Sequence, residues 1–375
     1  MDWLLNNTIY LAVHGSQCYG MATENSDLDA KGICIPPSEI ENDLFHTFEQ
    51  AENNIDIEKQ ISHLRNPKNP KIETTVYSLK KFIKLAAAVN PNVLELLYVK
   101  PEFQIIKNSA AEKLIQNRDL FLSARANFTF AGYAYAQLNK IQRHRKWIIT
   151  PRDLKQPRRN EYGLPEEAQQ EVEEVFRYVK GEVEKWNLSG FPLDENEKGK
   201  LKETIWELVY EISSKKVNWE NWVVAYTVTA IEKLARTLNL KEELLDLIKR
   251  ENQYRRDLQT YNSWINWKNN RNPARKALEE KSQYDTKHAS QLIRLLRSGL
   301  EILETGKFNV FRDDAEELLL IKNGGWTYDS VVEYAEMMNK KMAAAYKITK
   351  LPKSVNYVAI NSLYQELLFL GKTRT

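Results

Sequence analysis

Apolar and polar positions divide the chain into a mixed region of about a hundred residues and a longer helical remainder. Short apolar or alternating runs predict buried strands over residues 8–13, 28–35 and 72–77. The second run stops at Pro36 and Pro37, which cannot donate to a strand ladder. The pattern therefore predicts a small sheet near the N-terminus.

Helices are predicted between and after these strands. A short helix is expected over 17–22, residues 41–70 are expected to form a polar excursion or loop, and Ser78 and Asn90 each open a helix. We therefore expect an α+β chain, with a small mixed sheet in residues 1–115 and a large all-helical domain in residues 116–375. Amphipathic helical spacing in that second part covers residues 120–149, 165–186, 197–215, 219–250, 272–304, 312–322 and 327–347.

Composition agrees with a helix-rich globular protein. Apolar residues make up 42% of the chain and charged residues 28%, which permits a packed core and excludes a disordered tail. Only 13 of the 375 residues are glycine, so tight turns are few. The 2 cysteines cannot form a disulfide framework, and no run approaches the roughly 18 apolar residues of a membrane span. We expect a cytoplasmic protein without membrane contact.

The first candidate chemistry lies in residues 14–33, HGSQCYGMATENSDLDAKGI. Gly15 and Ser16 follow a predicted strand, where free backbone N–H groups and a hydroxyl can hold phosphate oxygens. Asp27 and Asp29 share one face of the next strand, because side chains alternate along a strand. Two carboxylates aimed at one point repel each other, and sharing Mg²⁺ or Mn²⁺ relieves that repulsion.

A third acid lies on the following strand, IETTVY. Glu73 shares a face of that strand with Thr75 and Tyr77. An acid on a strand adjacent to Asp27 and Asp29 would complete a two-metal site for in-line phosphoryl transfer.

The order of strand, Gly-Ser, Asp-x-Asp and a later acid on a strand resembles the DNA polymerase β superfamily of nucleotidyltransferases. The chain is similar above all to a bacterial and phage branch of that superfamily. That branch usually has aspartate where this chain has Glu73, whose longer side chain can still bind metal. The similar stretches are HGSQCYG…SDLDAKGI, ETTVYSLKKF…NPNVLELL, QRHRKWI, YDTKHASQLIRLLRSGLEIL and DAEELLLIKNGG. They cover most of the chain and imply a polymerase β-like nucleotidyltransferase domain, followed by a helical domain that closes over the acids.

The resemblance also implies roles for individual residues. Gly15 and Ser16 would bind the β- and γ-phosphates of a nucleoside triphosphate, and Asp27 and Asp29 would hold two Mg²⁺ ions. Glu73 would bind the catalytic metal and help to deprotonate an acceptor hydroxyl. That hydroxyl would attack the α-phosphorus and release pyrophosphate.

Cations of a later helix are candidate phosphate ligands. The helix is predicted to begin after Asp285 and to end at Gly306. Lys287 and Arg294 lie off its apolar stripe, where they would bind the triphosphate or, alternatively, form an ordinary solvated face. His288, at the edge of the stripe, is expected to be a buried, hydrogen-bonded side chain rather than a metal ligand.

A basic stretch supplies a candidate acceptor site. The net charge of only +3 excludes a globally basic nucleic-acid coat, but residues 140–159 hold eight Lys or Arg against one Asp. Arg143, Arg145 and Lys146, beside Trp147, would contact RNA or tRNA, although a solvated helix end explains the charges equally well. A protein or a small molecule is an alternative acceptor, and a non-catalytic nucleotide sensor is the alternative function. The oligomeric state stays open.

Overall fold

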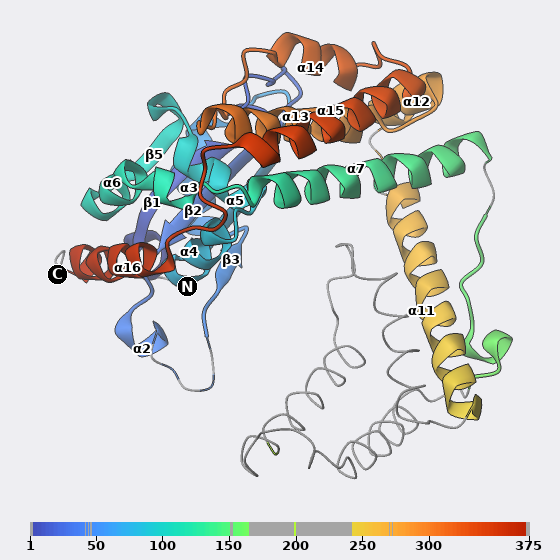
Figure 1. Ribbon diagram of the computed structural model, residues 1–375, viewed down its shortest axis with the longest axis horizontal. Coiled ribbons are helices and arrows are strands. Elements are labelled where there is room, and N and C mark those ends of the chain that lie inside the picture. Colours follow the sequence, from blue (N-terminus) through green and yellow to red (C-terminus); the bar gives the residue numbers. More distant parts are fainter. Residues whose placement is uncertain are drawn as a thin grey trace. The chain divides into compact units, whose positions relative to one another are not determined.

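The computed structural model describes residues 3–41, 43, 45, 47–150, 153–164, 199, 242–269, 271 and 273–372 (Figure 1). Its strands are β1 Thr8–His14, β2 Leu28–Cys34, β3 Gln50–Glu52, β4 Ile72–Ser78 and β5 Gln104–Lys107. Its α-helices are α1 Trp3–Asn6, α2 Ser38–Glu41, α3 Ile55–Ile61, α4 Leu79–Ala87, α5 Pro91–Leu94, α6 Ser109–Gln116, α7 Ala126–Ile149, α11 Glu242–Asn269, α12 Pro273–Ser282, α13 Thr286–Thr305, α14 Ala315–Lys322, α15 Tyr328–Ile348 and α16 Tyr357–Lys372. The 3-10 helices are η1 Ser62–Leu64, η2 Glu95–Tyr98, η3 Pro101–Phe103, η4 Arg118–Phe121 and η5 Arg159–Tyr162. This confirms the α+β class, with the sheet first and a largely helical part after it.

The five strands form one mixed sheet in the order β3-β4-β2-β1-β5. β2 and β4 are parallel, and the other neighbouring strands are antiparallel. Parallel neighbours begin at the same edge of a sheet, so the first residues of β2 and β4 lie next to each other. This edge is where the predicted acids are.

Helices cover both faces of the sheet. On one face α4 packs on β2 and β4, α6 packs on β1 and β5, and α16 contacts both helices. Tyr10 and Ile33 point into this larger core. On the other face, α3 packs on β4, and Leu11 and Val76 join its buried side chains. The alternation of buried side chains along the strands therefore gives two separate cores.

The chain divides into two compact units, one of Met1–Ile148 with Leu278–Thr375 and one of Ile149–Ala277. The larger core of the first unit combines side chains from both of its segments, such as Phe82 and Ile293. Within this unit α13 runs alongside α15 (Figure 1). These bounds do not coincide with the boundary predicted at residue 115, because the last hundred residues share a core with the sheet. Closure of helices over the acids stays a prediction.

In the second unit, the described residues link the segment around η5 to α11. Tyr162 donates a hydrogen bond to Asp257 (2.7 Å), and Arg250 donates one to the carbonyl oxygen of Gly163 (2.8 Å). The helices predicted over 165–186 and 197–215, and most of that over 219–250, lie outside the described residues. Among the described helices, none is long and apolar enough to cross a membrane.

Three local predictions are wrong. Residues 17–22 form a turn rather than a helix, because Gly15 and Gly20 both have positive φ, 68° and 75°. The excursion at 41–70 contains β3 and α3, whose first turn is capped by the Asn54 side chain. The helix predicted over 272–304 is divided into α12 and α13 at Gln283, which has a φ of 61°. The predicted start of α13 after Asp285 and its end at Gly306 are confirmed.

Candidate active site

Three carboxylates gather where β2 and β4 begin. Asp29 in β2 lies opposite Glu73 in β4 in the parallel register, and Asp27 precedes Asp29 by two residues. Leu28 between the two aspartates is completely buried in the core on the far face of the sheet. The period of two therefore puts Leu28 and Asp29 on opposite faces of β2, and the direct pairing of Asp29 with Glu73 puts these two acids on the same face.

The turn after β1 lies directly against these acids. His14, the last residue of β1, pairs with Asp29, and the next residue is Gly15. A Cβ atom on Gly15 would lie 2.1 Å from Oδ2 of Asp29, and the φ of 68° also favours glycine. The Ser16 hydroxyl is buried and has no hydrogen-bond partner within the described part of the chain. Gly15 and Ser16 thus lie where the sequence predicts a phosphate-binding turn.

The acids repel one another. Burial, followed by the charges of Asp27 and Glu73, raises the pKa of Asp29 to about 6, while Lys287 and Lys31 act in the opposite direction. Glu73 also forms an ion pair with Lys71, and this hydrogen bond raises the pKa of Lys71. The three carboxylates therefore form an acidic site in which Asp29 has a pKa close to neutral pH. Divalent cations bind such groups of carboxylates.

A family comparison agrees with this geometry. Residues 5–150 match the model of the RlaP family, described as an "RNA repair pathway DNA polymerase beta family". The matched range is less than half of the chain. The matched range contains Gly15, Ser16 and all three acids, which confirms the resemblance to the polymerase β superfamily.

The sequence match to one relative extends over the helical part of the chain as well. The chain is 26% identical over 361 residues to the "Uncharacterized 38.9 kDa protein in nrdC-mobD intergenic region" of Enterobacteria phage T4. The match spans 90% of this chain and 89% of the phage protein. No solved structure matches the chain.

Two lysines from the last hundred residues lie near the acids of the domain that matches the RlaP model. Lys287, in the first turn of α13, is exposed and interacts electrostatically with Asp29. Lys322 ends α14, and burial, followed by the charge of Lys287, lowers its pKa, while Asp27 acts in the opposite direction. The sequence prediction included Lys287 but missed Lys322. A single lysine in the last turn of a helix is common for reasons of the helix dipole, which hides its proximity to the acids.

Arg294 does not lie on a solvated face of α13, so that alternative is wrong for this residue. Its side chain is buried, forms an ion pair with Glu95 of η2, and lies 3.8 Å from the ring centroid of Tyr19. Helix α13 is buried on several sides, including Ser290 and Ser298 off the apolar stripe. An amphipathic reading of one helix therefore places Arg294 incorrectly.

The Glu95–Arg294 pair belongs to a buried network behind the turn. Tyr19 donates a hydrogen bond to Glu95, and His14 Nε2 lies 3.2 Å from the same carboxylate. Burial alone would raise the pKa of Glu95, but the Arg294 charge and the bonds from His14 and Tyr19 hold it below its usual range. Burial, followed by the charge of Lys31, lowers the pKa of His14 to about 4. The network joins α13 to both ends of the turn that contains Gly15.

The candidate acceptor residues lie in the last turns of α7. Lys146 is exposed, Arg143 is half-buried, and the Arg145 guanidinium lies 4.3 Å from the ring centroid of Tyr328 in α15. Arg145 therefore packs between helices, so its planar face is partly covered. The basic stretch continues past residue 148 into the second compact unit, so its two halves belong to different units.

Proposed function

We propose that this chain is a metal-dependent nucleotidyltransferase that transfers a nucleoside monophosphate from a nucleoside triphosphate to a hydroxyl group of RNA. The observation that carries the proposal is the meeting of Asp27, Asp29 and Glu73 beside Gly15, whose missing side chain leaves room for the Asp29 carboxylate. The family match supports the same chemistry, because it covers every one of these residues.

The three carboxylates fit Mg²⁺ or Mn²⁺. Carboxylate oxygens are the ligands that these hard cations prefer, and the repulsion that raises the pKa of Asp29 to about 6 is relieved by a divalent charge. Asp27 and Asp29 would hold both ions and Glu73 would hold the catalytic one. When bound, the metal would supply Lewis-acid stabilisation of the charge that develops on the transferred phosphate and on pyrophosphate.

The chain's own residues orient the triphosphate and accept the proton of the acceptor hydroxyl. The backbone of Gly15 and the Ser16 hydroxyl bind the outer phosphates, and Lys287 and Lys322 offset their negative charge. The Glu73 carboxylate accepts the proton of the acceptor hydroxyl. The ion pair between Lys71 and Glu73 must open before this transfer. All of these residues position groups and neutralise charge, and no covalent intermediate with the protein is involved.

RNA is the acceptor that the observations favour. The description of the family refers to an RNA repair pathway. Lys146 and Arg143 present positive charge at the end of α7, as contact with a phosphate backbone requires. A protein acceptor, a small-molecule acceptor and a sensor without turnover remain distinct outcomes of the experiment below.

The test is transfer of α-³²P-labelled nucleotide, supplied as each of the four triphosphates in turn, with Mg²⁺ or Mn²⁺ and cellular RNA. We expect label on RNA and release of pyrophosphate, both reduced at least about 1,000-fold in Asp27→Asn and in Asp29→Asn. Asp56→Asn is the matched control, because Asp56 is a half-exposed acid on α3 at the opposite face of the sheet.

Results other than labelled RNA distinguish the alternative acceptors and functions. Label on protein would move the acceptor but keep the reaction. Pyrophosphate release without label on any macromolecule would indicate a small-molecule acceptor. Tight triphosphate binding by calorimetry without turnover of any triphosphate would overturn the enzymatic proposal in favour of a sensor. Equal activity in the wild type and in Asp29→Asn would overturn the assigned site.

A further inference from the structure

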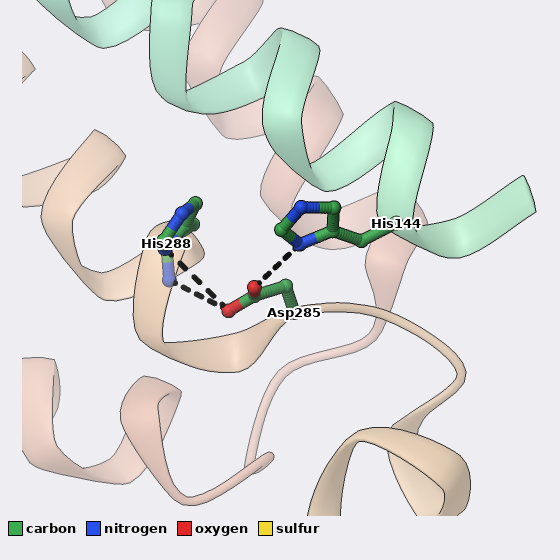
Figure 2. A group of neighbouring side chains, drawn as sticks. All are labelled: His144, Asp285 and His288. Carbon is green, nitrogen blue, oxygen red and sulfur yellow. Dashed lines mark hydrogen bonds and ion pairs between the residues drawn. The ribbon is translucent and has the colours of Figure 1, made fainter. Parts of the chain in front are cut away.

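A second group of metal-ligating side chains lies between α7 and α13. His144 comes from α7, and Asp285 and His288 come from the start of α13, more than a hundred residues later. Figure 2 shows the three side chains turned toward one another. One ligand atom can be chosen from each so that all three lie within 4.8 Å of one another. The catalytic acids are not members of this group.

The contacts centre on the Asp285 carboxylate. His144 Nδ1 lies 2.8 Å from Oδ2, and His288 Nδ1 lies 3.6 Å from Oδ1 (Figure 2). The Asp285 side chain is fully buried, whereas the side chains of His144 and His288 are 13% and 18% exposed. A buried carboxylate needs compensating positive charge, and the exposed edges of the imidazoles leave an entry path.

The surroundings hold these side chains in place. Asp285 is the N-cap of α13 and accepts a hydrogen bond from the backbone N–H of His288 (3.1 Å). The Trp147 ring stacks on His144, with the ring centroids 5.3 Å apart and the planes 25° from parallel. Outer contacts of this kind fix the orientation of metal ligands and partly shield them from water.

We propose that His144, Asp285 and His288 bind one divalent transition-metal ion of the zinc class. Two imidazoles and one carboxylate form a donor set that suits zinc and its neighbours and suits Mg²⁺ poorly, because Mg²⁺ prefers oxygen ligands. The ion compensates the buried Asp285 charge and ties α7 to the first turn of α13. His288 is then a metal ligand and not only a hydrogen-bonded core residue.

The position of the site gives it a consequence for nucleotide binding. Lys287 lies between Asp285 and His288 in the sequence, and its exposed side chain faces the Asp29 carboxylate. An ion bound by Asp285 and His288 would hold the backbone on both sides of Lys287 and so would fix the position of the Lys287 ammonium group. This consequence rests on the proposed function, whereas binding of the ion does not.

Cobalt binding tests the site without any need for turnover. The full-length chain, without a histidine tag and carrying Asp27→Asn and Asp29→Asn, is titrated with Co²⁺ and followed by visible absorption. The two substitutions remove the competing carboxylate site. We expect one equivalent of Co²⁺ to produce the absorption bands of a four- or five-coordinate ion, and Zn²⁺ to displace them.

Variants in the same background assign the ligands. His144→Ala and His288→Ala should each abolish the bands or weaken Co²⁺ affinity by well over about tenfold. His63→Ala, in the exposed η1 segment, should leave both unchanged. Asp285→Asn keeps a good N-cap residue and so tests the charge without removing the cap, and it should also weaken binding by more than about tenfold.

Absence of stoichiometric Co²⁺ bands in the parent chain would overturn the proposal and leave a purely hydrogen-bonded cluster. Bands that persist at parent affinity in His144→Ala and His288→Ala would overturn it too. If an alanine variant fails to fold, as judged by circular dichroism, His144→Gln and His288→Gln replace it. If the Co²⁺ bands appear as expected but the wild-type chain transfers no nucleotide, the result counts against the proposed function and leaves the metal site in place.

Discussion

Asp29 and Glu95 are both carboxylates next to the turn after β1, but their surroundings are opposite. Asp29 lies among Asp27 and Glu73, and its pKa is raised to about 6. Glu95 is fully buried, yet the Arg294 charge and the bonds from His14 and Tyr19 hold its pKa below the usual range. Burial alone would push both pKa values upward, so the neighbouring charges decide the difference.

This contrast separates a binding site from a structural pair. The charge of Glu95 is already compensated within the protein, and its removal should harm folding. The charge of Asp29 is compensated only in part, by Lys287 and Lys31, and its removal should harm metal binding while helping folding.

The largest effect on stability is expected at the buried pair. Arg294→Met leaves the Glu95 carboxylate buried without its main counter-charge, which should lower the free energy of unfolding by about 3–5 kcal/mol. Urea unfolding at pH 7, followed by circular dichroism, measures this. A loss smaller than about 1 kcal/mol would show that Glu95 finds compensation elsewhere.

The double variant Glu95→Gln with Arg294→Met supplies the control. Because both charges are removed together, it should be clearly more stable than the sum of the two single effects implies. Strict additivity would contradict a direct interaction between the two side chains.

Gly15 tests how closely the turn and the acid fit. In Gly15→Ala the new methyl group meets Oδ2 of Asp29 at 2.1 Å in a backbone conformation that disfavours alanine. We expect nucleotidyl transfer to fall about 100-fold, or about 2.7 kcal/mol in the barrier, through displacement of Asp29. Gly132→Ala, at a helix position with open space, is the matched control and should retain full activity. Equal loss in both variants would contradict the assigned role of the turn.

Much of the acid site could be predicted from sequence, because it depends on strand periodicity. The period of two predicts that Asp27 and Asp29 share a face and that Glu73 shares one with Thr75 and Tyr77, and the register of β2 with β4 brings Asp29 opposite Glu73. The buried role of Arg294 could not be predicted in this way. Its burial depends on which elements pack around α13, and helical periodicity describes only one helix at a time.

The same limit applies to the division of the fold. The strands β1, β2 and β4 carry strong local patterns, whereas β5 is a short edge strand, and it was missed. The helix α16 packs on α4 and α6 from the far end of the chain. Local sequence contains no signal for such a contact between distant segments, so the extent of the first compact unit had to come from the structure.

Asp29→Asn should stabilise the metal-free protein. The pKa of Asp29 is higher in the folded state, at about 6, than its ordinary value of 3.8, so ionisation opposes folding. Allowing for partial exposure, we expect a gain of about 1–2 kcal/mol above pH 7 that disappears as the pH falls from 6 to below 4. Thermal unfolding in EDTA across this range measures it. A gain that is independent of pH would contradict the electrostatic cause.

Lys322→Ala should have the smallest effect and tests whether a lysine outside the RlaP match belongs to the phosphate site. Burial, followed by the charge of Lys287, lowers the pKa of Lys322, so the two lysines interact and a polyanion bound beside them would offset their mutual repulsion. At a partly exposed position, its loss should raise the KM for the triphosphate about fivefold, or about 1 kcal/mol, with kcat nearly unchanged. Lys350→Ala, at an exposed position after α15, should leave KM unchanged. A fall in kcat at constant KM would instead give Lys322 a role confined to the transition state and would contradict its role in binding the triphosphate.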